Sequence, residues 1–147
     1  MTESVPLKVL FQEDGNIETL WADQVGPDQY RLDNSPFWAY GVSWRDVVEA
    51  RRDPDGALTF VRVVEKSGHR TVRLILDPPA DRSPESQAIL DGLRPLGATY
   101  EGMHPGYLAI DIPPGVAFDP VIAYLVGSGQ QWEHADPQYS DLYPNDE

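Results

Sequence analysis

The chain has 147 residues, and its 24 acidic and 11 basic side chains give a formal net charge of -13 at pH 7. A chain of this length forms one domain, or two small subdomains that share a core, and needs no metal or disulfide bond to fold. The absence of cysteine excludes a thiol nucleophile, a disulfide framework and every cysteine-ligated metal site. The acidic balance argues against direct binding to nucleic acid, because neutralising phosphate groups requires a basic patch.

No targeting or membrane segment is visible in the sequence. The N-terminal residues 1–6 lack the basic region and the apolar run of a secretory signal. The longest strongly apolar stretch without a charge, residues 121–126, is far shorter than a membrane-spanning helix. We therefore expect a cytoplasmic protein with no membrane partner.

The first half of the chain has the pattern of short antiparallel strands. Val5, Leu7, Val9 and Phe11 form one apolar face of a strand, and Asp14-Gly15 is a strong hairpin-turn signal. Further strands are expected over residues 17–25, 30–32, 46–51 and 57–65, with a second turn at residues 53–56. Short strands joined by tight turns predict a small antiparallel β barrel or a strongly curled sheet.

The second half alternates strands with helices. The predicted strands cover residues 70–76, 98–101, 108–112 and 131–135. Ser83-Pro84 is an N-cap followed by proline, and it predicts a helix that stops at Gly97. Asp119-Pro120 repeats this signature for a second helix that stops at Gly127.

The predicted order of elements is therefore β-α-β-β-α-β, which is the split βαβ or ferredoxin-like arrangement. The right-handed crossover rule places the first and third strands side by side at the centre of an antiparallel sheet. The expected fold class is α+β. It divides into an all-β subdomain at residues 1–69, a ferredoxin-like subdomain at residues 70–135 and an acidic tail at residues 136–147.

The negative charge is concentrated towards the C-terminus. From Pro95 to Glu147 the chain has eight acidic residues and no lysine or arginine. Such a segment produces a negative electrostatic field, which would steer cationic partners towards it. The alternative is that the charge serves only to keep an acidic protein in solution. If Val72 and Leu74 face the helices, the opposite face of the sheet carries Arg73 and several acids, and it packs on the barrel, stays solvated or docks a partner.

A basic partner would meet the acidic and tyrosine side chains of this second half. The tail itself is either a frayed terminus or an arm that combines carboxylates with aromatic packing area. The candidate partner-binding residues are Glu101, Asp111, Glu133, Asp136, Tyr139, Asp141 and Tyr143.

An aromatic cluster lies in the first half. It consists of Phe37, Trp38, Tyr40 and Trp44, and it follows a turn at residues 33–36. The run has no clean period of a strand or a helix, which fits a loop or a bulged strand. It either plugs the end of the barrel and joins the two halves, or it forms a recognition surface, because tryptophan and tyrosine dominate interface hot spots.

The run from Arg31 to Ala50, RLDNSPFWAYGVSWRDVVEA, followed by Val63 to His69, VVEKSGH, carries a family resemblance. It resembles an uncharacterised bacterial family, domain of unknown function 4265, over most of the chain up to about Tyr124. The resemblance implies a bacterial protein and no mechanism, and it transfers no catalytic residue.

The sequence shows no recognised catalytic or metal-binding motif. His69, His104 and His134 do not have ligand spacing with the nearby acids, and no nucleophile-elbow pattern is present. Gly127-Ser128-Gly129 lies at the C-terminal end of a predicted helix, where the helix dipole repels phosphate. We therefore expect no catalytic residue, no metal and no cofactor.

Two functions remain as hypotheses. The first is a non-enzymatic acidic module that binds a basic protein, most concretely an immunity or inhibitor protein for a toxin or nuclease. The alternative is an enzyme or small-ligand-binding protein that uses a cleft between the two halves, with Trp38, Tyr40 and Trp44 as its apolar wall.

Overall fold

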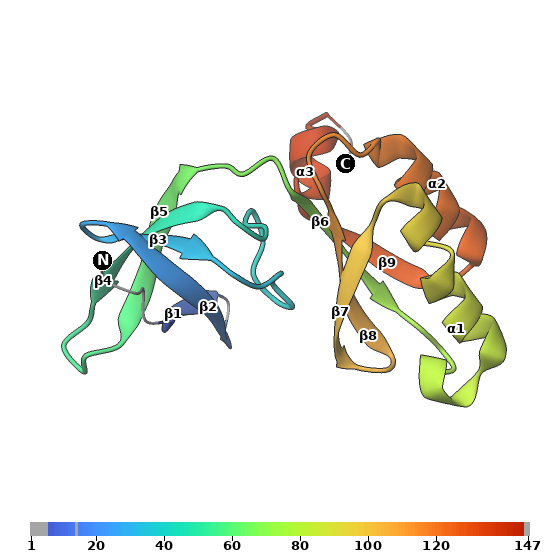
Figure 1. Cartoon of the computed structure of the whole chain (residues 1–147), viewed down its shortest axis with the longest axis horizontal. Coiled ribbons are helices and arrows are strands. Elements are labelled where there is room, and N and C mark those ends of the chain that lie inside the picture. Colours follow the sequence, from blue (N-terminus) through green and yellow to red (C-terminus); the bar gives the residue numbers. More distant parts are fainter. Residues whose placement is uncertain (1–5, 14, 146–147) are drawn as a thin grey trace.

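The computed structural model describes residues 6–13 and 15–145. Val5 of the first predicted strand, Asp14 of the first predicted turn and the terminal acids Asp146 and Glu147 lie outside the described residues. Two sheets lie side by side along the chain, and residues 66–69 connect them (Figure 1). The α+β fold class is confirmed.

The first half is a closed barrel of five strands. The strands are β1 (Leu7–Glu13), β2 (Asn16–Gly26), β3 (Gln29–Leu32), β4 (Val47–Arg52) and β5 (Leu58–Glu65). Consecutive strands pair antiparallel, and the barrel closes where Leu10 pairs with Thr59 in parallel. Because side chains alternate along a strand, Val9, Leu20 and Leu32 all point into the core and are almost fully buried. The predicted N-terminal barrel is confirmed.

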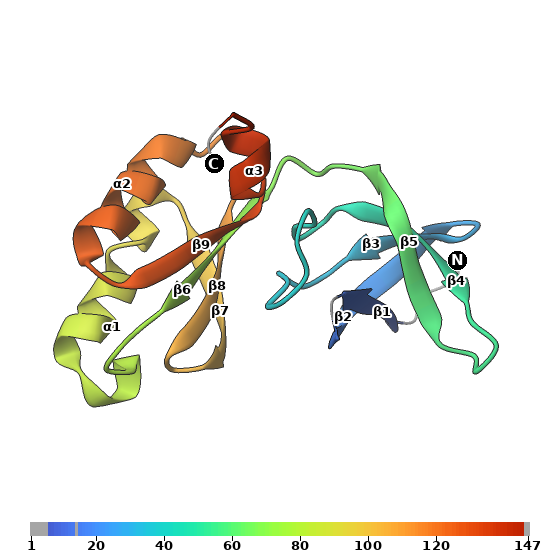
Figure 2. The same ribbon diagram turned by 180° about the vertical axis from the view of Figure 1, so that it is seen from behind.

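The second half is a four-stranded antiparallel sheet in the order β7-β8-β6-β9. Its strands are β6 (Arg70–Ile75), β7 (Thr99–His104), β8 (Tyr107–Ile112) and β9 (Gln131–Asp136). The helices α1 (Pro84–Asp91) and α2 (Phe118–Ser128) cover the face that points away from the barrel (Figures 1 and 2). Short 3₁₀ turns at Ala80–Arg82 and Arg94–Leu96 flank α1, and a last short helix, α3 (Tyr139–Leu142), follows β9.

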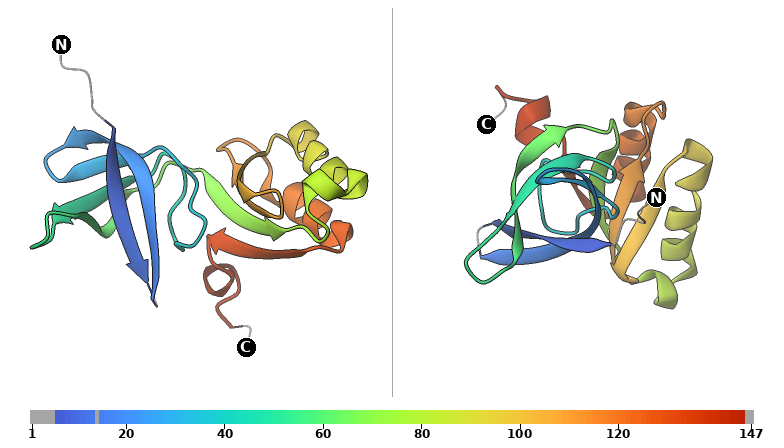
Figure 3. Two further views of the ribbon diagram at one scale, coloured as in Figure 1. Left: turned by 90° about the horizontal axis from the view of Figure 1, so that it is seen from below. Right: turned by 60° about the vertical axis from the view of Figure 1, so that its left-hand side comes forward.

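The core of this half lies between the helices and the sheet. Val72 and Leu74 of β6 are fully buried against Leu90 of α1 and the fully buried Val121 and Leu125 of α2. Burying one such side chain stabilises the fold by about 1.5–3 kcal/mol, so this layer fixes which face of the sheet is left for the barrel. That free face carries the side chains of Arg73 and Asp111, and Figure 3 shows the barrel and its loops opposite it.

The helix boundaries differ from the predicted ones. Ser83 caps α1 as expected, through its hydroxyl and the backbone N–H of Ser86, but α1 ends at Asp91 instead of Gly97. Pro95 explains the early end, because it has no N–H to donate to the Asp91 carbonyl and its ring would clash with that carbonyl in a continued helix. Residues 94–96 form a 3₁₀ turn instead.

The predicted cap at Asp119 is wrong. Helix α2 begins two residues earlier, at Phe118 instead of Pro120, and its N-cap is Ala117, whose side chain cannot accept a hydrogen bond. The helix also passes Gly127 and ends before Gly129, which adopts a left-handed φ of 74°. Within the described part of the chain, no helix combines the length and the apolar character that crossing a membrane would need.

Candidate functional site

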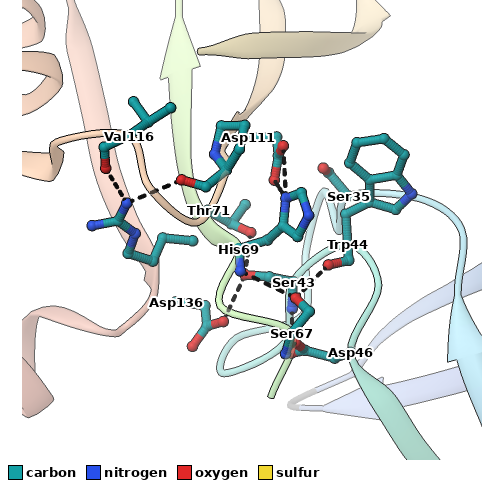
Figure 4. Close-up of polar contacts among 12 residues, drawn as sticks. Ser35, Ser43, Trp44, Asp46, Ser67, His69, Thr71, Asp111, Val116 and Asp136 are labelled. Carbon is teal, nitrogen blue, oxygen red and sulfur yellow. Dashed lines mark hydrogen bonds and ion pairs between the residues drawn. The ribbon is translucent and has the colours of Figure 1, made fainter. Parts of the chain in front are cut away.

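Hydrogen bonds between polar side chains tie the barrel to the second sheet (Figure 4). The Ser43 hydroxyl, which is fully buried, lies 2.6 Å from the Thr71 hydroxyl and donates to the Asp136 carboxylate over 2.6 Å. The Lys66 ammonium lies between the carboxylates of Asp46 and Asp136 and donates to both. Asp46 comes from the barrel side and Asp136 from β9, so Lys66 forms an ion pair with one acid from each half.

A second contact joins His69 to Asp111. The His69 Nδ1 atom lies 2.9 Å and 3.0 Å from the two carboxylate oxygens of Asp111. Burial raises the pKa of Asp111, and the neighbouring imidazole acts in the opposite direction. The Trp44 ring covers the imidazole, with the ring centroids 5.1 Å apart.

Arg73 lies at the centre of the free face of the sheet and is only 1% exposed. Its Nε donates to Glu133 over 2.8 Å, and its Nη1 donates to the backbone carbonyls of Ala39 and Pro36 over 2.9 Å and 3.3 Å. Its guanidinium also stacks over the Tyr40 ring at 4.5 Å. The Nη2 atom is buried and has no hydrogen-bond partner among the described residues. An unsatisfied buried donor costs about 1–3 kcal/mol, so a water that accepts from Nη2 would recover that free energy.

Glu18 of β2 organises the aromatic loop that Arg73 contacts. Its carboxylate accepts the backbone N–H groups of Phe37, Trp38 and Ala39, the last two over 3.0 Å. A carboxylate that accepts several backbone donors fixes the loop more firmly than neutral acceptors would. The backbone carbonyls that bind Arg73 are therefore held in place from the barrel side.

A cleft of about 960 Å³ opens between this loop and the sheet. Its walls are mainly aromatic and apolar: Trp38, Tyr40, Ile75, Met103, Tyr107 and Trp132, with Arg73, His104 and Glu133 among the polar lining residues. Trp38, Ile75 and Met103 are each 44–47% exposed, which is unusual for side chains of this size. The Tyr107 hydroxyl donates to the Phe37 carbonyl, so the two walls are joined across the cleft.

Some hydrogen-bonding groups that line the cleft have partners within the protein, and others do not. Both oxygens of Glu133 have partners, because Oε1 accepts from Arg73 and Oε2 accepts from the Tyr40 hydroxyl over 2.7 Å. The His104 Nδ1 accepts from the Gly106 N–H over 3.1 Å, which leaves the proton of the neutral ring on Nε2. The donor at His104 Nε2 therefore remains for a ligand, whereas Arg73 Nη2 is enclosed by the protein.

A second hollow, of about 650 Å³, lies beside the cleft and shares Tyr40, Trp132 and Glu133 with it. His134 lies at its base, packed edge-on against the Trp132 ring at 4.8 Å between centroids. Burial lowers the pKa of His134, because an apolar environment disfavours the imidazolium. Within the described ranges, no three histidine, aspartate or glutamate side chains come together to hold a metal ion.

The acids predicted to bind a partner divide into two groups. Glu101 accepts from the Ser35 N–H over 3.0 Å, so Glu101, Asp111, Glu133 and Asp136 all contact groups of this same chain along the junction of the halves. Asp141 caps α3 together with Gln138, and the Tyr139 and Tyr143 rings pack together there at 4.8 Å, each about half exposed. The role of these seven residues in binding a partner stays a prediction.

The four residues of the aromatic cluster also lie in two different places. Trp38 and Tyr40 line the cleft, the Phe37 carbonyl accepts from Tyr107, and Trp44 lies at the separate His69 contact. The sequence analysis assigns no role to Glu18, Lys66 or Tyr107. Arg73 is the one residue of the site that the sequence pattern singles out, because it is the single cation predicted on an otherwise apolar and acidic sheet face.

The loop contacts of Glu18 give a direct prediction. Replacing Glu18 with Gln puts an amide N–H₂ beside a backbone N–H, so it removes at least one of the three hydrogen bonds and the charge that strengthens them. We expect Glu18→Gln to lower the free energy of unfolding by about 2 kcal/mol in chemical denaturation. Glu13→Gln, on the exposed end of β1, is the matched control. Equal stability of the two variants would contradict the role of Glu18.

Comparisons with known proteins place the chain in a family. No curated protein sequence matches it. A solved structure described as "Novel crystal structure of a hypothetical protein from Neisseria gonorrhoeae" is similar, with a TM-score of 0.72 and 18% identity over 95% of this chain and 99% of that chain. At this identity the likeness shows a shared fold alone. Residues 18–135 match the family model "Domain of unknown function (DUF4265)", so the chain belongs to the DUF4265 family.

Proposed function

We propose that the protein binds a small aromatic molecule in the cleft between its two halves. The observation that carries this proposal is the composition of the cleft walls, in which Trp38 and Tyr40 from the barrel side lie over Tyr107 of the sheet. Trp132 also lines the cleft, although it packs against the core on the helix side of the sheet. A volume of about 960 Å³ is at the upper end of the range for small-molecule sites. Aromatic side chains offer large, rigid contact area, and their ring faces stack on flat ligands.

The preformed walls support the same proposal. Tyr40 is held by Glu133 and Arg73, and Tyr107 is held by the Phe37 carbonyl, so four side chains around the cleft already have fixed positions. A site that is ordered before binding loses less conformational entropy when the ligand arrives. The donor at His104 indicates that the ligand also carries a hydrogen-bond acceptor.

The fold assignment of the second half belongs to this proposal as well. We assign it to the ferredoxin-like arrangement on the basis of its element order and of the strand order β7-β8-β6-β9. In this arrangement the helices occupy one face of the sheet. The other face is left for the barrel and the cleft.

Titration of the full chain with aromatic probes tests the cleft. We use 2-naphthol, 2-naphthoate and indole, and we follow the indole N–H signals of the four tryptophans by NMR. We expect at least one probe to shift the Trp38 and Trp132 signals in a saturable way, and Trp38→Ala to weaken its binding about tenfold through lost stacking.

Trp21→Ala is the matched control for this titration. Trp21 is 45% exposed, like Trp38 at 44%, but it lies on the barrel, where its ring contacts Lys8. The Trp21→Ala variant should bind the probe with the same affinity as the unmodified chain. If no probe shifts the Trp38 and Trp132 signals, or if Trp21→Ala weakens binding as much as Trp38→Ala, the proposed function is wrong.

We propose binding of a basic protein, such as a toxin or nuclease that the chain would inhibit, as the second candidate function. The support is the set of exposed acids that the junction does not use: Asp77, Asp81, Glu85, Asp91, Asp119 and Asp141. Because Glu133 and Asp136 hold the halves together, charge reversal there would disturb the fold, whereas Asp119 and Asp141 are exposed.

Affinity capture from cell extract at rising salt tests this second candidate. We expect a complex with a basic protein that weakens as salt is raised, and that is weakened further in the double variant Asp119→Lys and Asp141→Lys. A complex that is insensitive to salt and to both reversals would contradict it, as would the recovery of no basic protein.

A further inference from the structure

A polar hollow beside the junction gathers basic side chains in this acidic protein. Its volume is about 400 Å³, and it shares no lining residue with the aromatic cleft. The lining residues are Arg31, Arg45, Val47, Glu65, Lys66, Ser67 and His69. All seven lie in the two segments, Arg31 to Ala50 and Val63 to His69, that carry the family resemblance. Neither proposed function uses this hollow.

The backbone of Arg45 is in an uncommon conformation. Its φ is 74°, in the left-handed region that favours glycine. The other described non-glycine residue in this region is Asp28, at 56°, and aspartate enters it several-fold more often than most residues do. An arginine at such a position costs stability that glycine would not cost, and strain of this kind collects at functional sites.

The side chain of Arg45 has no structural role that would explain the strain. It is exposed, and it forms no ion pair or hydrogen bond with the side chain or backbone of another described residue. The half-buried Arg31 likewise has no side-chain partner among the described residues. By contrast, the exposed Arg51 and Arg62 on the barrel are both paired with Glu49.

The rest of the hollow is rigid. In the barrel register Arg31 is opposite Val47, and Val47 is opposite Glu65, so these three side chains lie in a row across β3, β4 and β5. Lys66 is anchored by Asp46 and Asp136, yet its side chain is 45% exposed. The Ser67 hydroxyl donates to the Trp44 carbonyl over 2.8 Å, which fixes the segment next to Lys66.

We propose that this hollow binds the phosphate group of a small molecule. Two guanidinium groups that have no partner among the described residues supply donors from two chain segments, which suits the several oxygens of a phosphate group. The Lys66 ammonium lies beside them, but its three donors are used by the Gly41 carbonyl, Asp46 and Asp136. Glu65 is the one acid in the lining, and Asp46 and Asp136 take up the charge of Lys66, so the attraction for an anion rests on Arg31 and Arg45. The strain at Arg45 is then explained, because that backbone position directs the guanidinium to the anion.

Titration of the full chain with inorganic phosphate, at constant ionic strength set by sodium chloride, tests the proposal. We expect saturable shifts in the amide signals of Arg45, Lys66 and Ser67, and no matching shifts with acetate. Arg45→Gly should weaken phosphate binding about tenfold, since one charge-assisted contact is lost. The same variant should raise the melting temperature, since glycine relieves the strained φ.

Two controls make the outcome decisive. Arg62→Gln removes an exposed arginine outside the hollow and should leave phosphate binding unchanged. Arg45→Gln removes the charge without altering the backbone preference and should weaken binding as much as Arg45→Gly. The proposal is overturned if phosphate gives no saturable shifts, if acetate binds equally well, or if both Arg45 variants keep the affinity of the unmodified chain. The aromatic cleft is unaffected by any of these results.

Discussion

The burial of Arg73 between the two halves is the interaction on which the rest of the structure depends. An arginine at the centre of a sheet face is stable there only if its charge is paired and most of its donors have acceptors. Glu133 supplies the charge from the same sheet, and the carbonyls of Pro36 and Ala39 supply acceptors from the barrel side. Separating the halves would remove those two acceptors and the stacked Tyr40 ring at once. The guanidinium therefore fixes both the distance and the orientation of the barrel loop.

The contacts at this junction change how the acidic character of the second half is interpreted. A segment without a lysine or arginine of its own cannot pack its carboxylates against another surface unless that surface brings donors. Lys66, His69 and the Ser35 N–H bring them, and they meet Asp136, Asp111 and Glu101 respectively. Much of the single-sign field inferred from the sequence is used to hold the chain's own two halves together. The acids still exposed lie mainly on the helical layer and on α3.

The cleft and the basic hollow follow from the way the halves are joined. The loop that supplies carbonyls to Arg73 also carries Trp38 and Tyr40, so fixing one fixes the others over the sheet. The connecting residues 66–69, which cross from β5 to β6, carry Lys66 and Ser67 to the edge of the barrel, where Arg31 and Arg45 lie. Two sites with opposite chemistry, one apolar and one cationic, are thus built by one junction.

The sequence predicts the elements well and the contacts between them poorly, for a physical reason. Alternation along β1 and β6 and the Ser83-Pro84 cap are local signals, and they led to the barrel and to the start of α1. The cap expected at Asp119 fails because a local signature does not fix the start of a helix to within two residues. Glu18 and Phe37 are distant in sequence, as are Arg73 and Ala39, and no periodicity shows that such residues meet. The sequence pattern therefore predicts that these acids form an outer surface, whereas four of them lie at an internal one.

The central claim is that Arg73 and the acids around it hold the barrel and the second sheet as one body. Residual dipolar couplings of backbone amides in both halves, measured in one alignment medium, test this most directly. If the claim is correct, a single alignment tensor fits the couplings from residues 7–65 and from residues 70–136 together. Two tensors of different magnitude or orientation would show that the halves move independently, and would contradict the account of the junction and of the cleft built on it.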